Sequence, residues 1–209
     1  MNKLFLKKVN NFIKNRLIES SGIFLILASF FLLASITSYH PSDPNFIYNP
    51  ESTEIKNIGG FYGSSVADFI LQSMGLISIL LVINIFYWGL KLTIAKKISG
   101  LIVKISFIFI YVVFGTTSLN ILVNNSFWLI DNGNGGFIGR VIKENIYYFT
   151  PLIENQIIIY SLIFLTIIFF ILSLGTSSKE LKNIFYFPFG VIKKIIILFR
   201  KKPSNININ

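Results

Sequence analysis

The sequence predicts an all-α membrane protein with four transmembrane helices. Three observations predict this class: the composition, four long stretches with almost no charge, and an uneven distribution of basic residues. Only 13% of the 209 residues are charged, whereas 53% are hydrophobic and 16% are aromatic. Soluble domains carry about a quarter charged residues, and disordered chains are polar and poor in aromatics. The composition therefore argues against both of those classes.

The four predicted spans follow one another along the chain at residues 22–39, 69–90, 100–122 and 156–174. Each is long enough to cross about 30 Å of hydrocarbon as a helix. Lys104 is the one charged residue that they contain. The apolar residues do not alternate with polar ones, as they would in the strands of a membrane barrel. Helices are expected because each satisfies its own backbone hydrogen bonds.

The charges predict the orientation of these helices. Fifteen of the 19 basic residues lie in residues 1–21, 91–99 and 179–202, whereas seven of the nine acids lie in 40–68 and 123–155. By the positive-inside rule, both termini and the connection at 91–99 face the cytoplasm. We therefore expect a basic cytoplasmic tail at 1–21, a transmembrane domain at 22–178, and a basic cytoplasmic or interfacial tail at 179–209. Because topology accounts for the net charge of +10, no direct nucleic-acid binding is expected.

The C-terminal tail contains a second apolar stretch at 184–199, which is interrupted by Pro188, Gly190 and the pair Lys193–Lys194. It is too short and too broken for a fifth span. Two alternatives stay open: a C-terminal helix in the inner membrane interface, attracted to anionic lipids, or a short helix packed under the bundle.

The sequence offers no recognisable catalytic machinery. It has no cysteine, its one histidine is His40, and it lacks the glycine-rich lysine motif of phosphate-binding loops. We therefore expect no cofactor, no bound metal and no enzymatic activity. The predicted spans hold no Asp, Glu or Arg, which argues against active transport, although a small inner-membrane pore or transporter subunit is the alternative function. Gln72 and Asn84 are predicted to hydrogen-bond to neighbouring helices.

The connections between spans carry three motifs. Span one runs into Ser38-Tyr39-His40-Pro41-Ser42-Asp43-Pro44-Asn45, span two is preceded by Asn57-Ile58-Gly59-Gly60-Phe61-Tyr62-Gly63, and the later connection holds Gly135-Gly136-Phe137-Ile138-Gly139. A residue before proline favours extended backbone, so the prolines should end span one. Asp43 is expected to accept hydrogen bonds from nearby backbone amides in an Asx turn, and the glycines should allow a tight entry into span two.

These motifs, in this order and with four spans, resemble the N-terminal four-helix membrane domain of the FtsK/SpoIIIE family of DNA translocases, over about residues 20–185. The resemblance implies a membrane anchor or scaffold at the septum of a dividing bacterial cell, in the inner membrane, which serves cell division and chromosome segregation. It also implies contacts with the lipid bilayer and with division-site membrane proteins. The candidate partner-contact or structural loop residues are Tyr39, His40, Pro41, Asp43, Pro44, Asn57, Gly60, Gly63, Gly135, Gly136 and Gly139.

The family joins such a domain to an ATP-driven DNA motor, and these 209 residues contain neither that motor nor its linker. ATP hydrolysis is therefore not assigned to them. Three expectations stay open: a fragment of a longer chain, a stand-alone anchor, or half of a split translocase whose motor is separate. Self-association into a homo-oligomer is also left open.

Overall fold

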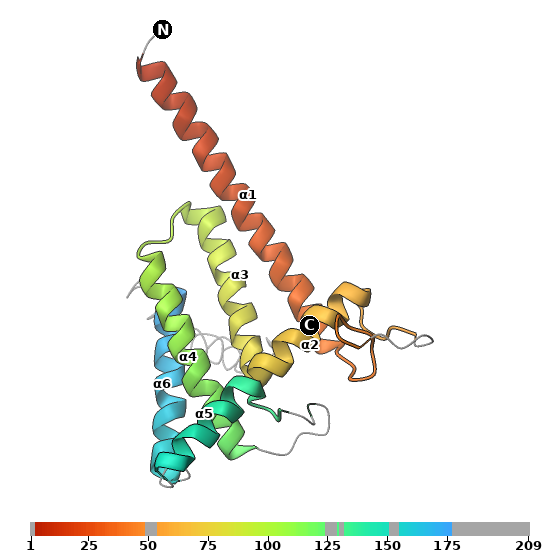
Figure 1. The fold of residues 1–209 in the computed structure, drawn as a ribbon. Helices are drawn as coiled ribbons and strands as arrows, with labels where there is room; N and C mark the ends of the chain where they lie inside the picture. The colour runs from red at the N-terminus through yellow and green to blue at the C-terminus, as the bar shows by residue number, and fades with distance from the viewer. Residues whose placement is uncertain (1–2, 49–53, 124–128, 130–131, 151–154, 177–209) are drawn as a thin grey trace, which may run out of the picture. The chain divides into compact units, whose positions relative to one another are not determined.

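A computed structural model describes residues 3–48, 54–123, 129, 132–150 and 155–176, and this part of the chain is helical without a strand (Figure 1). The helices are α1 (Lys3–Thr37), α2 (Gly60–Met74), α3 (Ser78–Ala95), α4 (Leu101–Leu122), α5 (Gly136–Phe149) and α6 (Gln156–Leu174), with a 3-10 turn, η1 (Gly75–Ile77), between α2 and α3. Four segments are long and apolar enough to cross a membrane: Phe5–Thr37, Gly60–Ala95, Leu101–Leu122 and Gln156–Leu174. The predicted all-α class with four spans is confirmed. The stretch at 184–199 lies outside the described residues.

The helices α1, α3, α4 and α6 alternate in direction, so their connections lie at two ends of the unit formed by residues 1–175 (Figure 1). The described parts of the connections 38–59 and 123–135 lie at one end, which we call the loop end. The connection 96–100 lies at the other, which we call the basic end because it begins with Lys96 and Lys97.

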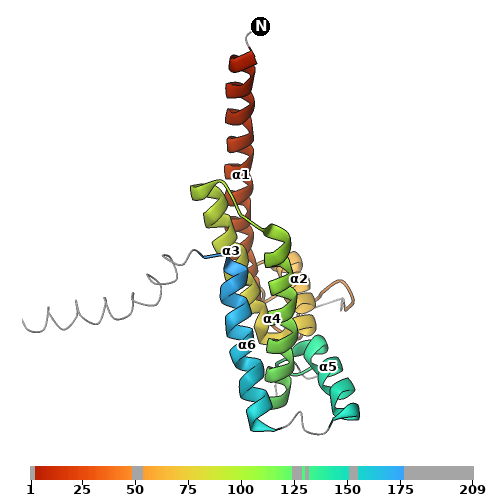
Figure 2. The same ribbon diagram turned by 90° about the vertical axis from the view of Figure 1, so that its left-hand side faces the viewer.

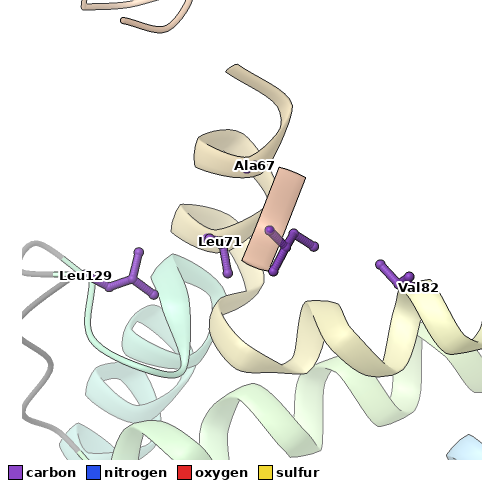
Figure 3. Close-up of a cluster of buried hydrophobic side chains, with 5 residues drawn as sticks. Ala67, Leu71, Val82 and Leu129 are labelled. Carbon is purple, nitrogen blue, oxygen red and sulfur yellow. The ribbon is translucent and has the colours of Figure 1, made fainter. Parts of the chain in front are cut away.

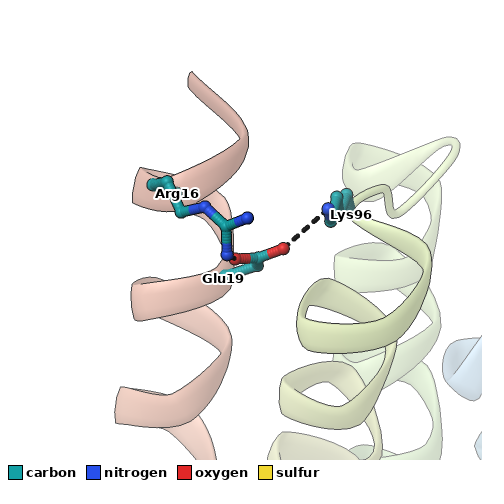
Figure 4. A network of polar contacts seen from close by, with 3 residues as sticks. All are labelled: Arg16, Glu19 and Lys96. Carbon is teal, nitrogen blue, oxygen red and sulfur yellow. Dashed lines mark hydrogen bonds and ion pairs between the residues drawn. The ribbon is translucent and has the colours of Figure 1, made fainter. Parts of the chain in front are cut away.

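Helix α1 is longer than the predicted first span. It runs without interruption for 35 residues, or about 52 Å, whereas the hydrocarbon core is about 30 Å thick. Its first turns, predicted as a separate tail, extend past the α3–α4 connection (Figures 1 and 2). No glycine or proline precedes Gly22, and Arg16 pairs with Glu19 three residues on, at 2.5 Å (Figure 4). Such a pair supports a helix on its exposed face.

The second span is not one straight helix. The predicted range of 69–90 contains a break at Gly75, where α2 ends and the chain changes direction before α3 (Figure 1). Gly75 has a φ of +57°, in the region that glycine adopts without steric cost. The backbone N–H of Leu76 donates to the carbonyl oxygen of Asn134 at 2.9 Å. The connection 123–135, which we call the second connection of the loop end, therefore supplies an acceptor at the break.

Two close helix pairs organise the unit. Helices α1 and α3 cross at Gly22 and Gly89, where a Cβ on Gly22 would lie 2.8 Å from the carbonyl oxygen of Gly89. Helices α4 and α6 pack through aromatic rings, including Tyr111 against Phe170 with ring centroids 5.5 Å apart. Membrane helices typically pack through small residues, which let their backbones approach, and through contacts between aromatic rings.

Helix α3 is joined to α6 by polar contacts. The side-chain amide of Asn84 donates to the hydroxyl of Ser173, and the indole N–H of Trp88 donates to the carbonyl oxygen of Ser173 at 3.0 Å. The prediction that Asn84 bonds to a neighbouring helix is confirmed.

A small apolar cluster at the loop end joins α1, α2, α3 and the second connection. Ala67 and Leu71 of α2 meet Val82 of α3 and Leu129 of the connection, together with Ile36 (Figure 3). Many other apolar side chains point outward, such as Ile102, which is 81% exposed. An apolar exterior is what a lipid environment requires.

Replacing Gly75 by alanine should destabilise the fold through the close contact at the helix break. The new Cβ would lie 1.9 Å from the carbonyl oxygen of Asn134, which adds about 1–3 kcal/mol of overpacking to about 1–3 kcal/mol for a backbone at φ +57° and ψ −142°, which side chains rarely adopt. Gly100→Ala is the control for a positive φ alone and should cost less, since Gly100 lies in the left-handed region at φ +63° and ψ +44° and its new Cβ would meet no atom within 4 Å. Unfolding of the purified chain by titration of a denaturing detergent measures both; equal losses would contradict this account of the break.

Candidate partner-binding site at the loop end

The α1–α2 connection is folded around a buried carboxylate. Asp43 is 3% exposed, and its two oxygens accept the backbone N–H groups of Lys56 at 3.1 Å and Asn57 at 2.8 Å. Charge-assisted hydrogen bonds of this kind are among the strong ones in proteins. The expected Asx turn at Asp43 is therefore wrong: this side chain bonds amides thirteen and fourteen residues away. Asn45 forms the turn instead, accepting from Ile47 at 2.8 Å.

Asn57 continues this network to the end of α1. Its side-chain amide donates to the carbonyl oxygen of Ser35 at 2.8 Å, and its amide oxygen accepts the N–H of Gly59 at 2.9 Å. Ser38 accepts the N–H of Ile58 at 3.0 Å. Helix α1 therefore holds the segment that leads into α2.

A second carboxylate, Asp68 of α2, fixes the connection against that helix. The hydroxyl of Tyr39 donates to one of its oxygens at 2.9 Å, and the side-chain amide of Asn45 donates to the other at 3.1 Å. Ser64 of the same helix donates to the carbonyl oxygen of Pro44 at 2.5 Å. The connection is thus tied to α2 at three points.

The second connection reaches the same region through glycines. A Cβ on Gly136 would lie 2.6 Å from the backbone nitrogen of Gly75, so the two segments meet at backbone distance. Asn132 donates to the side-chain oxygen of Gln72 at 2.8 Å. Gln72 was expected to bond to a neighbouring helix, and the structure places its partner in the connection instead.

A groove of about 600 Å³ lies between the two connections and α2. Its floor is polar and includes Ser65, Asp68, Gln72 and Asn132. Its rim is apolar, with large exposed side chains: Phe46, Ile47, Tyr48, Phe69 and Phe137. Ile47 is 94% exposed. A hollow with apolar walls and a few convergent polar groups is the usual form of a binding site, and aromatic residues dominate protein interfaces.

The structure divides the predicted site residues into two groups. One group is buried and shapes the connections: Asp43, Pro44, Asn57, Gly63, Gly135, Gly136 and Gly139. The other is at least partly accessible: Tyr39, His40, Pro41 and Gly60. Of these, Tyr39 and Pro41 line the groove. Contact of any of them with a partner stays a prediction.

His40 lies beside the groove among polar neighbours. One ring nitrogen is 2.7 Å from the hydroxyl of Ser42, and the other is 3.1 Å from the ammonium nitrogen of Lys56. The described residues contain no group of three histidine or acidic side chains that could hold a metal ion.

Sequence reasoning missed the apolar rim of the groove. Phe46, Ile47 and Tyr48 follow the proline motif directly, and Phe137 lies inside the glycine motif. A run of large apolar residues in a connection between spans is the signal that could have found them, because such residues are unusual where the chain meets water.

Comparison with known proteins places these features in a family. The family model described as the 4TM region of DNA translocase FtsK/SpoIIIE matches residues 14–182. The DNA translocase FtsK of Rickettsia bellii is 25% identical over 208 residues, which cover 94% of this chain and 27% of the relative. The DNA translocase FtsK of Rhizobium meliloti is 25% identical over 134 residues, which cover 64% of this chain and 15% of the relative.

A third relative, the DNA translocase FtsK of Azospirillum brasilense, is 31% identical over 88 residues, or 42% of this chain and 14% of the relative. The chain thus spans about a quarter or less of the length of these curated relatives. No solved structure matches the chain.

Asp43→Ala should open the α1–α2 connection. The change leaves the N–H groups of Lys56 and Asn57 without their acceptor, at a cost of about 1.5–3 kcal/mol. Trypsin should then cut after Lys56 in the detergent-solubilised chain at least about tenfold faster. Thr37→Ala, which removes an exposed hydroxyl that bonds only within α1, is the control and should match the parent. Unchanged cleavage in Asp43→Ala would show that the carboxylate does not hold the connection.

Proposed function

Since the chain belongs to the family of the 4TM regions of the FtsK/SpoIIIE DNA translocases, we propose that it anchors an FtsK-like translocase in the inner membrane at the bacterial division septum. The observation that carries this proposal is the family match over residues 14–182, which takes in α2 to α6 and most of α1. The match is to the membrane region and not to the motor. We therefore assign ATP hydrolysis and DNA movement to a motor that is fused to this region or bound to it.

The charges support one orientation in the membrane. Lys96 and Lys97 lie at the basic end, together with most of the basic residues of α1. The carboxylates of Asp43 and Asp68 lie at the loop end. By the positive-inside rule, the basic end and both termini face the cytoplasm, and the groove faces the other side of the membrane.

In this role, the groove receives an apolar segment of another division-site membrane protein. Phe46, Ile47 and Tyr48 extend from a connection that the Asp43 and Asp68 networks hold in place. Exposed side chains on a rigid support lose little entropy on binding. The polar floor offers acceptors to a partner's backbone or side-chain donors.

Single-cysteine labelling tests the orientation directly, since the natural chain has no cysteine. Ile55→Cys at the loop end should react with a membrane-impermeant maleimide on intact cells. Ser99→Cys at the basic end should react only after the membrane is permeabilised. The opposite pattern would overturn the orientation and place the groove in the cytoplasm.

Microscopy of a fluorescently tagged chain in dividing cells tests the anchor and its groove. The parent should concentrate at the septum. Phe46→Ala with Tyr48→Ala should reduce that enrichment severalfold, because loss of buried aromatic anchors typically costs about 2 kcal/mol or more.

The matched control is Phe109→Ala with Tyr160→Ala, which removes the same residue types from exposed positions on α4 and α6. It should leave septal enrichment and membrane level unchanged. A parent without septal enrichment, combined with ion leakage through vesicles that hold the purified chain, would favour the pore instead. Full enrichment of the groove variant would place the partner contacts elsewhere.

A further inference from the structure

A cavity of about 780 Å³ opens between the helices at the basic end. Its walls come from α1, the last turns of α3, the connection 96–100 and the first turns of α4. Lysine side chains line its mouth, namely Lys14, Lys96 and Lys97. Apolar side chains line the part nearer the middle of the helices: Leu25, Trp88 and Ile105.

The mouth of the cavity carries an excess of positive charge. Lys96 pairs with Glu19 at 2.6 Å, and Arg16 donates to the same carboxylate at 2.5 Å (Figure 4). Glu19 is thus shared between two cations and does not neutralise the others. Lys14 and Lys97 are exposed at the rim. Basic pockets of this kind between membrane helices attract anionic headgroups.

The deeper wall is apolar and well fixed. Leu25 lies about 16 Å further along α1 than Lys14, well inside the candidate span. Trp88 uses its indole N–H inside the bundle, donating to Ser173, which fixes the ring that lines the cavity. A soluble anion would match only the mouth, whereas a lysine rim above an apolar wall matches the headgroup and acyl chain of a phospholipid.

We propose that this cavity binds a phospholipid with an anionic headgroup. The phosphate lies between Lys14 and Lys97, and an acyl chain follows Leu25, Trp88 and Ile105 between α1 and α4. The lipid fills the space between these two helices and joins the long α1 to the rest of the bundle. This inference goes beyond the anchor role and depends neither on the orientation nor on a septal partner.

Fluorescence quenching tests the site with a reporter that the chain already contains. Trp88 is one of two tryptophans, so Trp128→Phe leaves it as the only emitter. The purified full chain is placed in vesicles that contain equal mole fractions of phosphatidylglycerol and phosphatidylcholine, with bromine in the acyl chains of one lipid or the other. Brominated phosphatidylglycerol should quench Trp88 more strongly than brominated phosphatidylcholine.

Two double variants separate a specific site from general attraction. Lys14→Gln with Lys97→Gln should lower the preference for phosphatidylglycerol about tenfold. Lys7→Gln with Lys8→Gln removes the same charge from exposed positions on α1 outside the cavity, and should keep the preference of the parent. An unchanged helical content by circular dichroism checks that each variant is folded. Equal quenching by the two brominated lipids, or an equal loss in both double variants, would overturn the proposal.

Discussion

The hydrogen bond from the N–H of Leu76 to the carbonyl oxygen of Asn134 governs how the loop end is built. Within a membrane, a backbone group that leaves its helix needs another acceptor or donor from the protein. The break at Gly75 is stable because the second connection supplies that acceptor, and glycine at 75 and 136 lets the two backbones approach. The break lets α2 leave the direction of α3 (Figure 1), and α2 carries Asp68 and Gln72 to the groove.

The residues of the loop motifs and the residues that form the rim of the groove are largely different sets. Asp43 and Asn57 are buried and bond to backbone groups, so their chemistry is used in holding the connections. Phe46, Ile47 and Tyr48 belong to the rim and lie directly after the proline motif rather than in it. Phe137 belongs to both sets, because it lies in the glycine motif and on the rim, and Tyr39 and Pro41 of the proline motif also line the groove. A loop motif can therefore hold a fold together while other residues form the exposed surface beside it.

Charge and hydrophobicity were sufficient to predict the class and the four spans, since crossing a membrane demands long uncharged segments. They could not predict the break at Gly75, because 69–90 is uncharged throughout and the acceptor on Asn134 lies in a connection far along the chain. Helix α5 was not predicted for a related reason: it contains Arg140, Lys143 and Glu144, so a search for uncharged spans assigns its residues to a connection. The role of Asp43 was misjudged because an Asx turn is a local interaction, whereas its real partners at Lys56 and Asn57 are close only after the connection has folded.

The crossing of α1 over α3 at Gly22 and Gly89 divides the longest helix into two unequal arms. About 22 Å of α1 lies toward the loop end, where the Asn57 network holds it, and about 28 Å lies toward its N-terminus. The two backbones approach each other closely at this point. A tilt of α1 about it moves the two ends in opposite directions, and the N-terminal end moves slightly further. A tilt of α1 that moves its loop end would thus move its N-terminal end, on the other side of the membrane, by a similar distance in the opposite direction.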